Sequence, residues 1–537
     1  MRITIAACFA AFGIVPAAFT QVSGTVVETG TGLPVAGAIV RVQTTETATT
    51  TAADGTFSLP GVTGTVVLAA AKFGSWNGSV TVTAPNTTAT ISLTTLPPGD
   101  DPSVHFTSSA NCNFCHQNVY SDWFQSPMAH GGENTWTIDL FNGLGTPHGM
   151  SGFVYTRDSK HKTGNPDGDC ASCHAPVLAA QGNGAETPML DVANATNEQL
   201  AGVACDLCHR LESVDLAYKD FPGVHPNKAK FRRLPLGSPP VMFGPWDDAV
   251  FTAGAMRPAY NPLFQSAQIC ALCHEDRNDH DDDGDYSDPG SIPHQSTYSE
   301  WLASPYAVPG PAFQDCKDCH MAPSGDTKVC VFGPDRDPSK IQAHTFLGTD
   351  EQSLRNAVDL DLRAVRKNGK VHATVKLTNT KAGHAVPTGS DFRNLVLLVE
   401  AVDANGAVLS QLGGDVVNIL GGVGDEAVGD YAGEAGKLYG KINYDGQYPA
   451  QFFTEAVLLL ADNRLFPFQP DVTTYEFAAP PTGEVRVRAR LIYRRAWRWL
   501  DLAKRWTYDG HGNPNLDLLA PHFGTLMEEA PVLVKGP

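Results

Sequence analysis

The sequence predicts a multidomain α+β protein with a β-sandwich at each end and a central domain of short helices and loops. Three observations lead to this prediction. Apolar and polar residues alternate as in strands before residue 97 and again after residue 350. Between these segments, ten of the twelve cysteines recur in five short patterns of one kind. At 537 residues the chain is also too long for a single hydrophobic core.

Residues 1–20 are typical of an export signal. Arg2 supplies a positive end, an uncharged run follows from Ile3 to Phe19, and small residues near Ala17 offer a cleavage site. No later stretch approaches the ~20 apolar residues of a transmembrane helix. We therefore expect an exported protein, in the periplasm or at the cell surface. The formal net charge of −19 argues against nucleic acid as a partner, because phosphates would be repelled.

The two terminal segments show the alternation of half-buried strands. Residues 21–96 contain three such runs, separated by turns at Gly32-Leu-Pro34 and Asp54-Gly55, and predict the first β-sandwich. A Pro- and Gly-rich linker follows at 97–104. Residues 351–500 alternate again and predict a second β-sandwich, and 501–537 are expected to form a C-terminal tail.

The repeated pattern is C-x-x-C-H, the attachment signal of c-type haem. Two thiols one short turn apart can bond to the haem vinyl groups, and the adjacent histidine becomes the proximal iron ligand. Structural zinc would need two separated ligand pairs, and a thiol-redox site would need no histidine. We therefore predict five haems c in residues 105–350, bound by Cys112, Cys115, Cys170, Cys173, Cys205, Cys208, Cys270, Cys273, Cys316 and Cys319, with His116, His174, His209, His274 and His320 as proximal ligands.

The haems must lie close together, because so few residues separate the motifs that none can be enclosed separately. Mutual proximity is what electron conduction requires. Twelve of the seventeen histidines remain after the proximal five, enough for a second histidine on every iron. The spacing does not pair them with irons. The candidates for distal ligands are His130, His161, His225, His344 and His384.

An acidic stretch after the fourth motif matches the D-x-D-x-D-G opening of a calcium loop. Its candidate ligands are Asp279, Asp281, Asp283 and Asp285. The closing glutamate is missing, since Gly290 occupies its place. The stretch is therefore either a calcium site or a solvated acidic loop.

Two parts of the chain resemble known families. Residues 21–96 resemble the carboxypeptidase regulatory-like domain, in Gly24, Pro34, Gly37, Asp54-Gly55 and Phe57. That resemblance implies an accessory module without catalytic residues. Residues 105–500 resemble the exported multihaem, pentahaem-type cytochromes c. The shared segments are Tyr120–Ala129 and its echo Tyr298–Ala307, Gly202–Arg210, Phe243–Asp248, Cys319–Pro323, His344–Gly348, Gly383–Gly389 and Asp462–Arg464.

The second resemblance implies electron transfer, with other redox proteins as donor and acceptor and with histidine distal ligands. One departure concerns the fourth motif, before which the family commonly has histidines. This chain has Tyr260 and Phe264 there. The alternative function is therefore a multihaem reductase whose haem on Cys270 and Cys273 is open to substrate. A mainly adhesive surface protein is a third hypothesis, which rests on the two β-modules.

Overall fold

The computed structural model describes residues 21–85, 87–182, 187–189, 196, 202–251 and 256–536, so the predicted signal peptide lies outside the described residues. The chain divides into two compact units. One comprises residues 1–98 and 239–262, and the other comprises 99–238 and 263–537.

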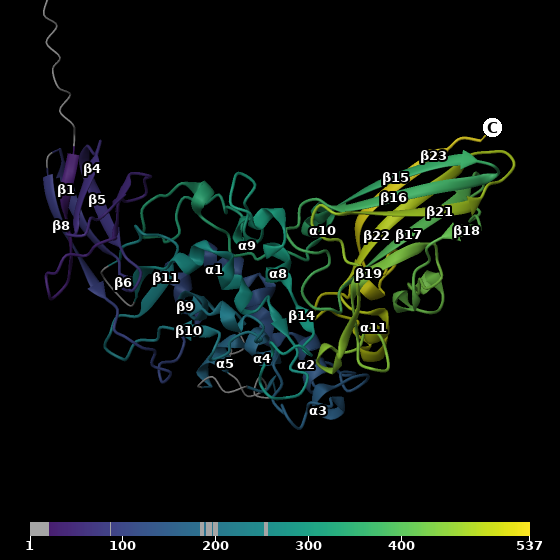
Figure 1. Ribbon diagram of the computed structural model, residues 1–537, viewed down its shortest axis with the longest axis horizontal. Coiled ribbons are helices and arrows are strands. Elements are labelled where there is room, and N and C mark those ends of the chain that lie inside the picture. The colour runs from purple at the N-terminus through teal and green to yellow at the C-terminus, as the bar shows by residue number, and fades with distance from the viewer. Residues whose placement is uncertain are drawn as a thin grey trace, which may run out of the picture. The chain divides into compact units, whose positions relative to one another are not determined.

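The first unit contains a sandwich of two four-stranded sheets (purple in Figure 1). Alternate residues of its strands are buried, as the sequence pattern predicts. Gly24 marks a close approach, because a Cβ atom there would lie 2.1 Å from the Ala89 carbonyl oxygen. The strands are β4 (Thr56–Pro60), β1 (Gln21–Glu28), β8 (Thr87–Thr95) and β6 (Ser75–Trp76) in one sheet, and β3 (Ala48–Thr50), β2 (Ile39–Val42), β5 (Gly64–Ala71) and β7 (Gly78–Ala84) in the other.

Residues 239–262 belong to this first unit, although the sequence pattern assigned them to the central domain. They contain the parallel strands β11 (Val241–Gly244) and β12 (Arg257–Tyr260). The Arg41 guanidinium binds both carboxylate oxygens of Asp247, at 2.6 and 2.9 Å. The side-chain amide of Asn77 donates to the carbonyl of Trp246 at 3.2 Å and accepts from the amide of Tyr260 at 3.0 Å. These contacts join segments far apart in sequence, which periodicity does not reveal.

The second unit begins inside the predicted linker. Asp100 accepts from the Arg233 guanidinium at 2.6 Å, so this end of the linker is fixed to the central region. The central region consists of short elements, as predicted. Its helices are α1 (Gln117–Phe124), α2 (Thr135–Phe141), α3 (Tyr155–Asp158), α4 (Cys170–His174), α5 (Pro176–Gln181), α7 (Cys205–His209), α8 (Thr297–Leu302) and α9 (Cys316–His320), and its 3₁₀ turns are η1 (Ser109–Phe114), η2 (Pro127–Glu133), η4 (Leu216–Tyr218), η5 (Pro262–Gln265), η6 (Ala267–Leu272), η7 (Pro305–Ala307) and η8 (Pro338–Lys340). Two short antiparallel pairs complete it, β9 (Leu211–Val214) with β10 (Ala229–Phe231) and β13 (Asp276–Arg277) with β14 (Pro293–Gln295).

The C-terminal part is a second sandwich with longer strands (green to yellow in Figure 1). Val371 and Val375 of one sheet and Leu397, Val487 and Leu491 of the other share one core. The sheets are β15 (Val358–Lys367), β16 (Lys370–Asn379), β21 (Pro470–Ala478) and β18 (Gln411–Gly414), and β20 (Leu458–Asp462), β19 (Gly436–Tyr444), β17 (Asn394–Asp403), β22 (Val485–Arg494) and β23 (Thr525–Val534). The remaining elements are α10 (Glu351–Ala357), η9 (Ile419–Gly421), η10 (Glu426–Val428), η11 (Phe453–Glu455), α11 (Arg498–Lys504) and η12 (Leu516–Leu518).

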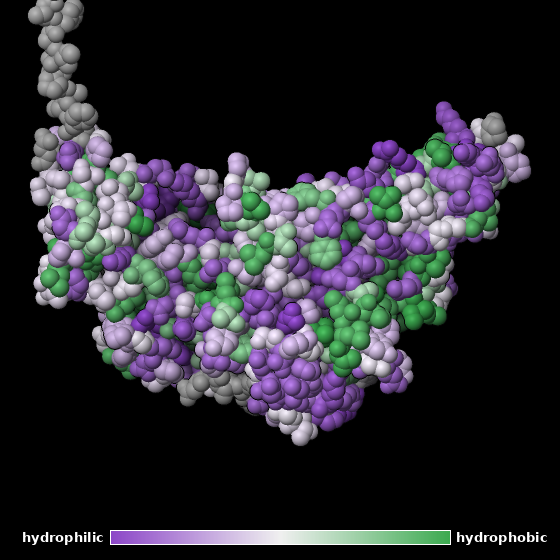
Figure 2. Space-filling view, in the orientation of Figure 1, coloured by the Kyte–Doolittle hydropathy of each residue, from purple (hydrophilic) through white to green (hydrophobic). Residues whose placement is uncertain are grey.

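Residues 501–536 of the predicted tail are part of this sandwich and not a separate tail. The predicted boundary falls inside α11, and β23 pairs along β22 from Tyr493↔Thr525 to Val485↔Val534. At the other edge of the same sheet, β20 exposes Leu458, Leu459 and Leu460. Figure 2 shows hydrophobic residues gathered over the elements labelled β19 and α11 in Figure 1.

The structure confirms the predicted fold class, a multidomain α+β protein with sandwich regions and a central part of short helices and loops. In the part of the chain that the structure describes, no helix is long and apolar enough to span a membrane.

Candidate haem sites

Each C-x-x-C-H motif lies on a single helical turn. Motifs two, three and five coincide with α4, α7 and α9, each of which begins at the first cysteine and ends at the histidine. Motifs one and four begin on the 3₁₀ turns η1 and η6, which end one residue before the second cysteine. One turn brings both thiols and the imidazole to one side of the backbone. This donor set fits a covalently attached haem.

Two of the predicted proximal imidazoles bind a carbonyl through Nδ1. His116 Nδ1 donates to the carbonyl of Val329 at 2.8 Å, and His320 Nδ1 donates to the carbonyl of Leu347. Because a carbonyl only accepts, a proton resides on Nδ1, and Nε2 is the nitrogen that can ligate iron. Burial lowers the pKa of His174 to about 4, so this ring is neutral at physiological pH. Iron needs a neutral imidazole as its ligand.

Thiol contacts show which motifs are neighbours. The thiols of Cys112 and Cys205 lie close enough to interact, which brings motifs one and three together. In the same way Cys173 meets Cys273, and Cys270 meets Cys316. Motif four therefore adjoins motifs two and five. The ring of Phe264, just before motif four, stacks on His209 of motif three with centroids 5.3 Å apart. The five motifs form one connected cluster.

His384 lies beside His320, one of the predicted proximal histidines. Its ring centroid is 6.1 Å from that of His320, and the two rings are within 14° of parallel. Its Nδ1 donates to the carbonyl of Ala385 at 2.9 Å, so Nε2 is the free nitrogen. Burial lowers the pKa of His384 and keeps the ring neutral.

His344 lies near motifs one and three. Burial, together with the nearby rings of His209 and His116, lowers its pKa to about 4. Its Nδ1 donates to the carbonyl of Gln342 at 3.2 Å, and its backbone amide donates to the Asp122 carboxylate at 3.3 Å.

The other three predicted distal ligands have different surroundings. His130 uses both ring nitrogens, with Nε2 2.8 Å from the Phe124 carbonyl oxygen and Nδ1 3.1 Å from the Glu133 carboxylate. His225 packs against Phe221 with the ring planes tilted by 54°, and it accepts an amide hydrogen bond through Nδ1. His161 is buried and binds Asp282 of the acidic loop at 2.8 Å.

The sequence reasoning did not select His294 and His511, which lie near motif two. Burial is the largest cause of the lowered pKa of His174, and the charges of His294 and His511 lower it further. His294 also stacks on Phe453, with ring centroids 3.7 Å apart. Both residues are far from motif two in the sequence, so the sequence did not indicate that they lie near it in the structure.

Tyr260 and Phe264 do not share one environment. Tyr260 lies on β12 in the first unit, whereas Phe264 contacts the proximal histidine of motif three. The presence of phenylalanine and not histidine at position 264 therefore affects the surroundings of the third motif as well as those of the fourth.

The acidic loop gathers three of its four predicted ligands. Ligand oxygens of Asp279, Asp281 and Asp283 lie within 4.8 Å of one another. Asp279 accepts from the amides of Asp282 and Gly284, at 2.9 and 2.8 Å. The carboxylate of Asp285 instead binds the Ser287 hydroxyl at 2.6 Å.

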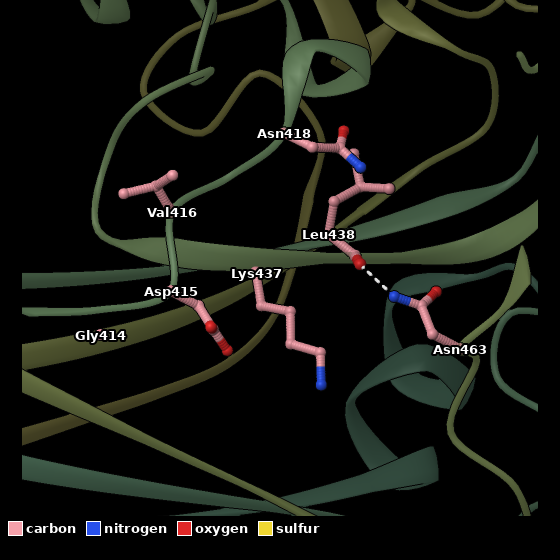
Figure 3. A pocket seen from close by; sticks show the side chains of 7 residues that line it. All are labelled: Gly414, Asp415, Val416, Asn418, Lys437, Leu438 and Asn463. Carbon is pink, nitrogen blue, oxygen red and sulfur yellow. Dashed lines mark hydrogen bonds between the residues drawn. The ribbon is translucent and has the colours of Figure 1, made fainter.

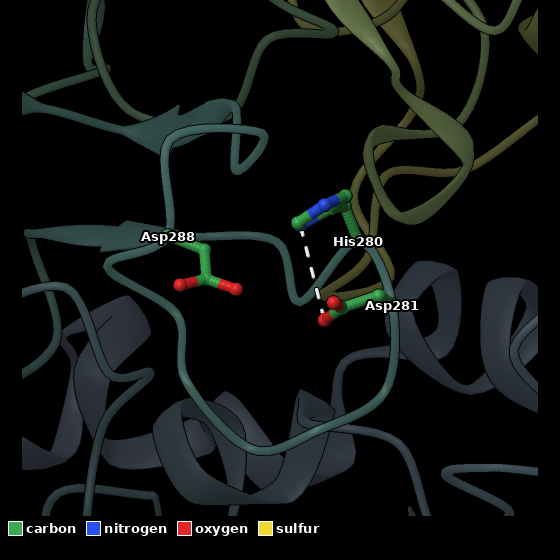
Figure 4. A group of neighbouring side chains, drawn as sticks. All are labelled: His280, Asp281 and Asp288. Carbon is green, nitrogen blue, oxygen red and sulfur yellow. Dashed lines mark ion pairs between the residues drawn. The ribbon is translucent and has the colours of Figure 1, made fainter.

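A second group in the same loop consists of His280, Asp281 and Asp288 (Figure 4), whose ligand atoms also lie within 4.8 Å of one another. The sequence prediction did not include His280 and Asp288 as ligands.

A buried polar network joins α8 to the C-terminal sandwich. The Arg464 guanidinium binds Glu300 of α8 and Asp462, both at 2.7 Å. The second carboxylate oxygen of Glu300 accepts from the Thr388 hydroxyl at 2.6 Å and from the Ala385 amide at 3.2 Å. The segment that carries His384 is therefore fixed directly to a helix of the haem region.

The C-terminal sandwich has an open hollow of about 490 Å³ (Figure 3). None of the residues that line it belongs to a C-x-x-C-H motif. Across it the Asn463 amide donates to the Leu438 carbonyl at 2.7 Å. The lining residues are Gly414, Asp415, Val416, Asn418, Lys437, Leu438 and Asn463.

No protein-family model and no curated protein matches the chain. Among solved structures, it is similar to a penta-haem cytochrome c552 from Thermochromatium tepidum, with 24% sequence identity and a TM-score of 0.54. The match covers 80% of this chain and 99% of that chain. The chain therefore has a multihaem cytochrome fold.

Two mutant cohesin–X-dockerin complexes from Acetivibrio cellulolyticus match 14% of this chain and 52% of theirs, with 20% and 26% identity. Both TM-scores are 0.12, and these matches carry no argument.

The network around Glu300 predicts a pH-dependent stability. Burial by itself raises the pKa of Glu300, but the charges of Arg464 and Lys441 outweigh burial and lower it from 4.5 to about 2. Because the folded-state pKa is depressed, the carboxylate stabilises the fold above about pH 4.5, and this contribution is lost as the pH falls toward 2. The free energy of unfolding of Glu300→Gln should therefore depend less on pH between about 4.5 and 2, and be lower at neutral pH. Denaturant unfolding at a series of pH values measures both.

The matched control is Glu351→Gln, which alters an exposed pair with Arg355 and should leave the pH profile unchanged. Identical pH profiles for the unchanged protein and Glu300→Gln would contradict the prediction.

Proposed function

We propose that this chain is an electron-transfer protein with five covalently bound haems c. The observation that supports this most strongly is the contact network of the motifs, in which thiol pairs join motif one to three, two to four and four to five. Haem iron supplies reversible one-electron chemistry. The chain's own part is to hold the attachment sites next to one another and to present neutral imidazoles to them.

We infer that the haem on Cys316 and Cys319 has two histidine ligands, His320 and His384. An imidazole nitrogen binds a first-row metal at about 2.1 Å, so two rings on opposite sides of one iron have centroids roughly 6 Å apart. The two rings are 6.1 Å apart and nearly parallel, and the Nδ1 atom of each is bound to a carbonyl. Both Nε2 atoms are therefore free to ligate.

We further propose that the protein is exported to the periplasm or the cell surface and exchanges electrons with other redox proteins. The export-type segment at residues 1–20 supports the location. The N-terminal sandwich suits a spacer role, as the resemblance to regulatory-like domains implies.

The acidic loop is proposed to bind calcium. Three carboxylates converge there, and oxygen ligands in this number suit a hard divalent cation. The Nδ1 atom of His280 in the same loop is buried without a hydrogen-bond partner among the described residues.

The mature protein should carry five haems. Its intact mass should exceed that of the processed polypeptide by five haem masses, because ten cysteines are consumed in five motifs. In the denatured protein, a thiol reagent should then modify Cys330 alone. A fully matured sample with four or fewer haems, or with additional reactive thiols, would contradict the prediction.

Replacement of His384 should change a single haem. In His384→Ala the iron on Cys316 and Cys319 loses its second imidazole and should become high-spin with a raised potential, while all five attachments survive. Low-temperature EPR and spectroelectrochemical titration measure this. His372→Ala is the control, since His372 of β16 pairs with Glu476 of β21 and its replacement should leave every haem unchanged. If His384→Ala leaves every iron low-spin, His384 is not a ligand.

Calcium removal should destabilise the acidic loop. A calcium chelator should lower the thermal midpoint by a few degrees, and added calcium should restore it, because the three carboxylates repel one another without a cation. Asp281→Asn should abolish the response. Asp285→Asn should retain it, because that carboxylate binds Ser287 instead. A protein that contains no calcium and does not respond to the chelator would sink this proposal.

A further inference from the structure

The haem region contains the same arrangement twice. In the first copy, η1 carries motif one, α1 follows it, and α7 carries motif three. In the second copy, η6 carries motif four, α8 follows, and α9 carries motif five. The Cys112–Cys205 and Cys270–Cys316 thiol contacts join the first cysteines of the two motifs in each copy. The echo between Tyr120–Ala129 and Tyr298–Ala307 is therefore a repeat in three dimensions.

The same backbone hydrogen bond joins the start of each helix to the histidine of the preceding motif. The amide of Tyr120 donates to the carbonyl of His116 at 2.8 Å, and the amide of Tyr298 donates to the carbonyl of His274 at 3.2 Å. The second bond forms although β13, the acidic loop and β14 intervene between its two residues.

The tryptophan of each helix holds the backbone that leads into the partner motif. Trp123 Nε1 donates to the carbonyl of Val203 at 2.7 Å, and Trp301 Nε1 donates to the carbonyl of Gln314 at 2.9 Å. Val203 and Gln314 both lie two residues before the first cysteine of a motif. Their amides also donate to matching carbonyls, of Met128 at 2.9 Å and Tyr306 at 3.1 Å. These bonds position the helix that carries the proximal histidine.

The acidic residue just before each tryptophan holds a different segment. Asp122 accepts from the backbone amide of His344 at 3.3 Å. Glu300 accepts from the amide of Ala385, next to His384, at 3.2 Å. Both carboxylates therefore bind the main chain at a histidine that lies near the partner motif. Hydrogen bonds from amides to a carboxylate are charge-assisted and strong.

We propose that α1 and α8 are equivalent clamps, each of which fixes both axial ligands of one haem. The tryptophan fixes the proximal side and the carboxylate fixes the distal side. By this equivalence His344 is the distal ligand of the haem on Cys205 and Cys208, opposite His209. Asp122 and Glu300 are positioning residues that act through the histidine segments. The inference rests on the proposed histidine ligation and extends it to a second haem.

The geometry explains why such a clamp is needed. Axial ligands must be held to within a fraction of an ångström, and segments on loops depend on their hydrogen bonds for this. His344 lies between η8 and α10, outside any helix or strand. A rigid helix that binds both segments sets the distance between the two imidazoles.

The test uses the mature holoprotein with EPR at low temperature and haem-resolved potentials. His344→Ala should turn one low-spin haem high-spin. Asp122→Ala should change the spin state or potential of that same haem, and Asp122→Asn should largely restore it, since an amide oxygen still accepts. His209→Lys identifies the haem, because it alters the proximal ligand on α7. Asn118→Ala is the matched control, since Asn118 lies on the same helix and donates to Asp326 instead.

The clamp is overturned if Asp122→Ala leaves all haem signals unchanged, or shifts a haem other than the one that His344→Ala affects. The pairing is overturned if His344→Ala affects a haem other than the one that His209→Lys marks. Failure of the proposed function itself would appear in the unsubstituted protein, as missing haems or as predominantly high-spin iron. Mass spectrometry of each variant shows whether all five attachments have formed.

Discussion

Hydrogen bonds that tie short helices to distant main-chain segments are the constraint on which the rest of the haem region depends. Its helices span one or two turns, and the buried apolar cluster around Trp301 consists of Ala267, Ala271, Tyr298 and Trp301. Both sandwiches, by contrast, have extended cores. Helices this short are marginal by themselves, so hydrogen bonds to distant main-chain segments help to order them. The tryptophan and carboxylate contacts of α1 and α8 are bonds of this kind.

Buried contacts join the C-terminal sandwich to the haem region. Trp506 stacks on Trp136 of α2 at 4.2 Å and donates through Nε1 to the buried carboxylate of Asp139 at 2.7 Å. Lys504 of α11 donates to the Asp139 carbonyl at 2.9 Å. Arg464 of the C-terminal part also binds Glu300 of α8. Because breaking a buried ion pair leaves an uncompensated charge, these joints resist separation. A histidine carried by the sandwich, such as His384, is therefore held in place relative to the haem region.

The sequence was sufficient for the fold class, because strand alternation and the C-x-x-C-H spacing are local patterns. It also revealed the repeated helix. It could not place residues 239–262, whose assignment depends on Arg41 meeting Asp247 across the sequence. It took residues 501–537 for a tail, although β23 completes a sheet by pairing with β22. Of the five chosen distal histidines, His384 and His344 lie near proximal rings. Pairing depends on such long-range contacts, which spacing does not encode.

The two copies of the clamp have kept their geometry while diverging in charge. In the first copy, the proximal His116 donates to a neutral carbonyl, that of Val329. In the second copy, an insertion with β13 and β14 separates His274 from α8, yet the Tyr298 amide still reaches the His274 carbonyl. Asp276, which lies in this insertion, favours the protonated form of His274, whereas the nearby Arg393 disfavours it more strongly. The insertion thus adds a charged neighbour to the second copy without disturbing its hydrogen-bonded frame.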